Sequence, residues 1–332
     1  MPFPAIVCLA VAIGLVVSDD RRDSVQAIRD RHDRALIAEL RAYLEANPQA
    51  PDRDAGYLKI FETAIDHDWF LDVEPLAQAL LESEPEGGVA PMARIVVTMA
   101  RAHAGDFVKA REGFRHLMTS LDDERQIAFA ADFTQSVAAE AIAAGRTDVA
   151  ADLYRGLLER FGADTDLRAD VSRWQARLEL VGQPAPDFEA ADLDGARFRL
   201  ADWKGKGKYI LLEFWASWCA PALADRPALL STYQAHHRDR LEVVSVSLDD
   251  DPEAARRVIR QGAWPWRQLH AGSSGIDLLE LYRVEQIPAS VLIGPDGRIE
   301  RLDIRAAALD ALLSNLPQPA SPRTSGGAAP GR

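Results

Sequence analysis

The stretch Tyr209 to Ala222, YILLEFWASWCAPA, decides the fold of the carboxy-terminal half of this chain. Its first part, Tyr209 to Trp215, is an apolar run with the length and composition of a buried strand. Residues 216–218 then lead to Cys219, where we expect a helix to begin. The amino terminus of a helix carries partial positive charge, which favours the thiolate, the form of cysteine that attacks disulfides. The stretch therefore predicts a strand that delivers a reactive thiol to the start of a helix.

The residues Trp218 to Pro221 match, one for one, the start of the Trp-Cys-x-Pro-Cys signature, and here the chain resembles the thioredoxin superfamily. The match ends at Ala222, which stands where that signature has its second, resolving cysteine. The resemblance implies that Cys219 is catalytic. It also implies that Trp218 and Pro221 border the substrate groove.

The order of expected elements after Gly182 supports this resemblance. A proline-stiffened extended segment and a hairpin around 193–195 come first, and strands then alternate with helices. We expect strands at Tyr209 to Trp215, Leu241 to Leu248, Ala289 to Ile293 and Arg298 to Ile304, and helices at Cys219 to about His236, Pro252 to Gln261, around Ile276 to Tyr282, and Ala306 to Leu316. This order predicts an α/β sandwich of the thioredoxin type over residues 182–316. Within the superfamily the chain looks most like thiol-disulfide oxidoreductases of the TlpA and ResA type, which are related to the AhpC/TSA and Redoxin group.

The segment Ile287-Pro288-Ala289 matches the cis-proline loop that faces the active cysteine in this superfamily. A cis bond before Pro288 turns the chain sharply and leaves a backbone edge able to pair with an extended substrate. The resemblance therefore implies Pro288 as a second catalytic element, with Ile287 and Ala289 in the substrate groove.

Glu213 lies in the otherwise apolar strand, at the position where thioredoxins carry a buried acidic proton acceptor. Because burial raises the pKa of a carboxyl group, a buried Glu213 is suited to move a proton to or from the active cysteine. With Ala222 in place of a second cysteine, that role is partly idle. The alternative is a Glu213 that points outward from one face of the sheet.

Residues 20–180 have helical patterning, with apolar residues three and four positions apart. Two segments share a glycine, then an alanine, then an aromatic residue: Gly105, Ala110 and Phe114 in one, Gly145, Ala150 and Tyr154 in the other. This pattern resembles the second helix of a tetratricopeptide (TPR) repeat, so we expect an all-α, TPR-like half. The alternative is an ordinary helical bundle. Either arrangement suits a surface for a protein partner better than a catalytic one.

Residues 1–18 resemble an export signal. The apolar run Ala5 to Val17 is shorter than the about 20 residues that usually span a bilayer and fits the core of a signal peptide. We expect a periplasmic or otherwise exported protein, in contact with a membrane only if residues 5–17 stay attached as an anchor. The tail, residues 317–332, is rich in Pro, Ser, Gly and Ala and is expected to be disordered.

The net charge of −13 argues against a nucleic-acid-binding surface, which needs a basic face. The isolated histidines of the helical half lack paired-ligand spacing, and Asp249 to Asp251 before Pro252 is interpreted as a helix cap. We therefore expect neither a metal site nor a cofactor. Trp264, Trp266 and His270 are expected to pack in the core.

Two main hypotheses for function follow. Cys219 can attack a substrate disulfide, but without a second cysteine the mixed disulfide needs an external thiol to resolve it. The first hypothesis is a monothiol exchange protein whose partners are protein thiols or disulfides and an external thiol donor. The second is a redox-inactive binding or scaffold module that recognises protein partners. A peroxidase is disfavoured, because Ala216 stands where peroxiredoxins need a threonine. Whether the chain is an enzyme stays open at this point.

Overall fold

The computed structural model describes residues 7–8, 25–121 and 123–316. Apart from Val7–Cys8, the predicted export or anchor segment lies outside this range, and so does the predicted tail at 317–332. Within the described ranges, no helix combines the length and the apolar character needed to cross a bilayer.

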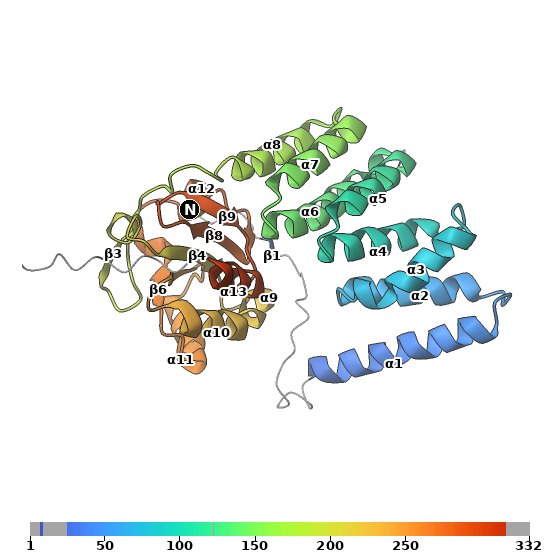
Figure 1. Ribbon diagram of the computed structural model, residues 1–332, viewed down its shortest axis with the longest axis horizontal. Coiled ribbons are helices and arrows are strands. Elements are labelled where there is room, and N and C mark those ends of the chain that lie inside the picture. Colours follow the sequence, from blue (N-terminus) through green and yellow to red (C-terminus); the bar gives the residue numbers. More distant parts are fainter. Residues whose placement is uncertain (1–6, 9–24, 122, 317–332) are drawn as a thin grey trace, which may run out of the picture.

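Apart from the two-residue strand β1 (Val7–Cys8), every regular element of the described amino-terminal half is helical. The α-helices are α1 (Val25–Ala46), α2 (Arg53–Asp66), α3 (Phe70–Ser83), α4 (Ala90–His103), α5 (Phe107–Ser120), α6 (Ile127–Ala143), α7 (Thr147–Phe161) and α8 (Thr165–Leu178). In Figure 1 they stack in chain order, from α1 in blue to α8 in green. Consecutive helices pack on one another, as α3 does on α4 and α6 on α7. The predicted helical patterning is confirmed.

The two copies of the glycine, alanine and aromatic pattern have the same local structure. Gly105 and Gly145 each follow a helix with a φ of 75°, in the left-handed region that favours glycine. The alanine of each copy is completely buried, and the aromatic residue is nearly so. A small residue at this place lets α5 and α7 approach their neighbours closely.

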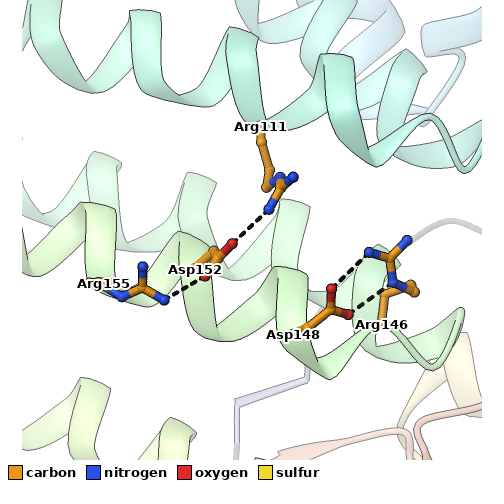
Figure 2. A network of polar contacts seen from close by, with 5 residues as sticks. All are labelled: Arg111, Arg146, Asp148, Asp152 and Arg155. Carbon is orange, nitrogen blue, oxygen red and sulfur yellow. Dashed lines mark hydrogen bonds and ion pairs between the residues drawn. The ribbon is translucent and has the colours of Figure 1, made fainter.

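One polar contact joins α5 to α7 near the surface, and two more lie along α7 (Figure 2). Arg111 of α5 reaches Asp152 of α7, with its Nη1 2.6 Å from Oδ2. Asp152 also pairs with Arg155 on its own helix, while Arg146 binds Asp148 through two nitrogens. Ion pairs exposed to this degree contribute little stability. The packing of these helices therefore depends mainly on their buried apolar side chains.

The carboxy-terminal half combines strands and helices. Its elements are β2 (Glu189–Ala191), β3 (Arg197–Arg199), β4 (Tyr209–Trp215), α9 (Ala220–Ala224), α10 (Arg226–His236), β5 (Leu241–Ser247), α11 (Pro252–Gly262), β6 (Arg267–His270), α12 (Leu278–Leu281), β7 (Gln286–Ile287), β8 (Ala289–Ile293), β9 (Ile299–Leu302) and α13 (Ala306–Asn315), with β1 (Val7–Cys8) paired to β7.

The main sheet of the described residues has five strands in the order β6-β5-β4-β8-β9. β4 lies at its centre, parallel to β5 and antiparallel to β8, and all seven of its residues are buried. Side chains of α10 and α13 pack on one face of the sheet, and those of α11 and α12 on the other. This is the thioredoxin-like α/β arrangement that the sequence predicted.

Two expectations about elements were wrong. The strand β6 was not predicted, because its short sequence, RQLH, carries no β-branched residue and is recognised only through its pairing with β5. The single helix expected from Cys219 to His236 is broken at Asp225 into α9 and α10. Pro227 explains the break, because it has no N–H to donate to the preceding turn.

The two halves share one continuous apolar core, which runs from α3 through α8 into the sheet. Arg177 of α8 joins them: its Nη1 donates to the carbonyls of Tyr282 at 2.8 Å and Arg283 at 3.2 Å. Its Nη2 pairs with Asp303 at 2.8 Å, and the side chain is only 13% exposed. The helical half is therefore packed firmly against the α/β half.

Arg177→Ala should lower the free energy of unfolding by about 2 kcal/mol, because it leaves Asp303 and two carbonyls without their charged donor. Urea denaturation followed by tryptophan fluorescence measures the change. Arg155→Ala is the matched control, since the Arg155 side chain is 63% exposed, and it should change stability by less than about 0.5 kcal/mol. Equal effects of the two substitutions would contradict the joining role of Arg177.

Candidate functional site

The chain after β4 places Cys219 at the start of α9. Its N–H donates to the carbonyl of Ala216 at 3.1 Å, and its own carbonyl accepts from the N–H of Leu223 at 3.2 Å. The Sγ atom lies 3.6 Å from the carbonyl oxygen of Ile287, and the side chain is completely buried. The thiol therefore faces the chain segment immediately before Pro288.

The peptide bond between Ile287 and Pro288 is cis, as the sequence predicted. Pro288 lies between β7 and β8, and β8 pairs directly with the central strand β4. The backbone of β7 accepts another strand, because Val7–Cys8 pairs with Gln286–Ile287 in parallel register. The loop thus presents backbone groups to an extended chain right beside the sulfur of Cys219.

Asp249 holds the loop that leads from β4 to Cys219. Its carboxylate accepts hydrogen bonds from the N–H of Ser217 at 3.0 Å, from the hydroxyl of Ser217 at 2.5 Å and from the hydroxyl of Ser247 at 2.8 Å. Because these donors satisfy a buried carboxylate, the loop is fixed in one position. The sequence interpretation as a helix cap is confirmed for Asp251, which accepts from the N–H of Glu253, and missed the role of Asp249.

Glu213 is buried, so the alternative of an outward-facing side chain was wrong. Its Oε2 lies 2.8 Å from Nη1 of Arg226 and accepts a hydrogen bond from the hydroxyl of Ser245 at 2.7 Å. Burial raises the pKa of Glu213 above its ordinary value, although Arg226 and Ser245 both act to lower it.

Arg226 is buried among three indole rings. Its Cζ lies 4.3 Å from the ring centroid of Trp264, 4.5 Å from that of Trp215 and 5.9 Å from that of Trp266. Burial lowers the pKa of Arg226, but a guanidinium remains charged at neutral pH. The negative faces of the rings and the carboxylate of Glu213 together compensate this charge.

Sequence reasoning missed Arg226 as the partner of Glu213. A buried acid needs a basic partner, and Arg226 is the first basic residue after Cys219 in the chain. The sequence alone could therefore have suggested Arg226 as the partner of Glu213. The packing of Trp264 and Trp266 against the guanidinium depends on the fold and could not be predicted. Both tryptophans do pack in the core, as expected.

A cavity of about 210 Å³ lies between the two halves, beside this ion pair. From the α/β half it is lined by Glu213, Ala222, Pro288 and Ala289, among others, and from the helical half by side chains of α6, α7 and α8. The structure thus brings these four expected site residues to one space. Four other expected site residues do not line it: Cys219, Ile287, Trp218 and Pro221. Trp218 is 54% exposed on the surface.

The reactive group of the candidate site is the single thiol of Cys219. Cys219 supplies the sulfur, Glu213 a carboxyl group, and the segment before Pro288 a backbone edge. Ala222, one helical turn after Cys219, provides a methyl group. Within the described ranges, no group of three or more His, Cys, Asp or Glu side chains is arranged to hold a metal ion.

Comparison with known proteins identifies relatives of the α/β half. Residues 181–302 match the model of the AhpC/TSA family. The chain is 29% identical over 119 residues to the thiol-disulfide oxidoreductase ResA of Bacillus thuringiensis, which covers 36% of this chain and 66% of that protein. It is 31% identical over 140 residues to the ResA of Oceanobacillus iheyensis, covering 41% of this chain and 71% of that protein.

Among solved structures, the thioredoxin domain of a thiol-disulfide oxidoreductase from Bacteroides vulgatus is 29% identical. That comparison covers 40% of this chain and 95% of the domain, with a TM-score of 0.37. The chain spans about two thirds of the length of the curated relatives, 66% in the Bacillus thuringiensis protein. Its 31% identity over 71% of the Oceanobacillus iheyensis protein is enough to conclude that the chain belongs to the ResA family of thiol-disulfide oxidoreductases, through a thioredoxin-like domain of the AhpC/TSA type.

Proposed function

We propose that this protein is a monothiol exchange protein in which Cys219 attacks substrate disulfides and an external thiol completes the reaction. The observation that supports this most is the place of the sulfur, 3.6 Å from the Ile287 carbonyl and next to Pro288. An extended substrate paired with β7, as Val7–Cys8 is, would bring its disulfide to Cys219. Trp218, exposed beside Cys219, and Pro221 would border that substrate on the outer side.

The reaction has two stages. The thiolate of Cys219 forms a bond to one sulfur of the substrate, the substrate disulfide breaks, and the other sulfur leaves as a thiolate that takes up a proton. In relatives with a second cysteine, that cysteine would then attack the mixed disulfide. Ala222 has no sulfur, so a thiol from outside the α9 turn has to do so.

In this proposal Glu213 is the proton acceptor and donor of the site. Its raised pKa suits it to take a proton from an incoming thiol and to return it to a leaving thiolate. Arg226 keeps the carboxyl group in place. The catalytic group would then consist of Cys219, Glu213 and Pro288, with Ile287 and Ala289 lining the groove.

One observation favours the second candidate, a redox-inactive module that binds protein partners. The side chain of Cys219 is completely buried, so a substrate disulfide reaches the sulfur only after the groove opens. The partner would bind to the helical half, at residues 20–180, whose stacked helices we propose to be TPR-like repeats. The thioredoxin-like domain would be residues 182–316.

The apolar run Ala5 to Val17 supports export of the protein in either case.

The first test is a search for mixed disulfides on Cys219 in cells that express the full chain. We expect discrete adducts on a non-reducing gel, identified by mass spectrometry, because a thiol without a resolving neighbour accumulates its intermediate. Cys219→Ser should abolish them and Cys8→Ser should not. Partners that co-purify equally with Cys219→Ser, and no adduct in any preparation, would instead favour the binding module.

Ala222→Cys should convert the protein into a dithiol reductase. An intramolecular thiol acts at a high effective concentration, so we expect insulin disulfides to be reduced at least about tenfold faster than by the natural chain. Ala224→Cys, which adds a thiol elsewhere on α9, is the matched control and should give no such gain. Equal rates for both variants would mean that the groove does not support exchange.

The Glu213–Arg226 pair can be tested by its effect on stability. Glu213→Gln leaves the buried charge of Arg226 unpaired and should cost about 3–5 kcal/mol in urea denaturation. The double variant Glu213→Gln/Arg226→Met removes that charge as well and should recover most of the loss. Simple addition of the two single effects would show that the side chains do not act as a pair.

A further inference from the structure

We propose that the cavity between the two halves is the binding site of a low-molecular-weight, uncharged thiol that resolves the mixed disulfide on Cys219. This inference rests on the proposed monothiol exchange and assigns the chemical class of its external thiol. It also gives the helical half a part in the reaction, because helices α6 to α8 supply one wall of the cavity.

The position of the cavity relative to the sulfur supports this assignment. Ala222, one helical turn after Cys219, lines it, and so does Pro288, which directly follows the carbonyl that lies 3.6 Å from Sγ. Cys219 and Ile287 are not themselves lining residues, so a bound thiol has to pass between Ala222 and Pro288 to reach Sγ. The short side chain of Ala222 leaves room where a resolving sulfur would otherwise lie.

The size of the cavity selects a small molecule. Its volume, about 210 Å³, is below the roughly 300–1,000 Å³ of pockets for drug-sized ligands. It is larger than a cavity of about 150 Å³, which is enough for benzene. Arg177 and Arg305 join the helices to the α/β half at Asp303 and Glu140, so the two walls of the cavity are held together.

The charges around the cavity favour an uncharged ligand. Each arginine that lines it has an acidic partner: Arg173 with Glu285, Arg177 with Asp303, Arg283 with Glu179, and Arg305 with Glu140. These cations are therefore already neutralised and do not attract an anionic thiol. Apolar side chains, including Tyr154 and Trp174, whose ring centroids are 5.5 Å apart, make up most of the rest.

Two carboxyl groups in the lining are placed to take the proton of the thiol. Burial raises the pKa of both Glu213 and Asp225 above their ordinary values. A thiol has a pKa near 8.5, and proton transfer is more favourable to a carboxylate whose pKa lies closer to it. Inside the cavity an incoming thiol therefore meets a better proton acceptor than a carboxylate in water.

Release of the substrate and recovery of Cys219 take two successive thiol exchanges. The small thiol gives its proton to a carboxylate, its sulfur bonds to Sγ of Cys219, and the bond from Sγ to the substrate breaks. The substrate leaves as a thiolate and takes up that proton. A second molecule of the small thiol then attacks the new disulfide, restores Cys219 and leaves as the symmetrical disulfide. Two thiols are oxidised for each substrate disulfide that is reduced.

The experiment separates the two stages in the full-length chain carrying Cys8→Ser. Cys219 is first loaded with an extended peptide whose cysteine is activated by 2-nitro-5-thiobenzoate, and the released yellow thiolate reports the first attack. The adduct is then treated with 2-mercaptoethanol, and mass spectrometry follows the release of the peptide. A thiol attached to a polymer too large for the cavity serves as a second reagent.

Ala139→Phe fills the cavity from α6, away from Cys219. It should slow release by 2-mercaptoethanol about tenfold, because the thiol loses its oriented approach, and should leave the loading step unchanged. Ala128→Phe adds the same ring to an exposed position of α6 and should change neither step. The polymer thiol should act slowly on all three proteins. If Ala139→Phe does not fold, Trp174→Ala gives the opposite test, since a larger cavity should admit bulkier thiols and speed their reaction.

Equal release rates for Ala139→Phe and Ala128→Phe, after normal loading, would overturn the cavity assignment and leave monothiol exchange intact. Equal rates with the polymer thiol and 2-mercaptoethanol would overturn it in the same way. Failure of Cys219 to load in the parent chain would overturn the exchange function and the thiol site together.

Discussion

Glu213 lies in the central strand of the sheet, where water cannot solvate its charge, and much of the surrounding structure follows from this constraint. Its counter-charge comes from Arg226, and Arg226 in turn needs partners of its own. The indole rings of Trp215, Trp264 and Trp266 provide them. The ion pair thus ties β4 to α10 and to the segment before β6.

The helical half changes what the thioredoxin-like half can do. Its helices close one side of the α/β half and leave a cavity of defined size between them. The outer side carries the exposed Trp218, and there β7 pairs with Val7–Cys8. In the proposed reaction the helical side admits only a small thiol, and this restriction comes from the packing of α6 to α8 rather than from the motif.

The sequence was sufficient for the features that depend on neighbouring residues. The apolar run of β4 predicted a central buried strand, and the start of α9 at Cys219 and the cis bond before Pro288 followed from local motifs. Features that join distant segments were out of reach. Asp249 binds Ser217 across two strands, and the wall opposite Ala222 comes from another half of the chain. Such contacts depend on how the elements pack, which hydrophobic periodicity does not encode.

The break in the helix at Asp225 affects how the sequence of the site can change during evolution. Pro227 separates the short turn that carries Cys219 and Ala222 from α10, which carries Arg226. A substitution in that turn can therefore alter reactivity without displacing the ion pair that supports the sheet. The α9 turn can therefore change in sequence while β4 and α10 keep their positions. A lineage could pass between two-cysteine and one-cysteine chemistry at position 222 while the rest of the molecule kept its shape.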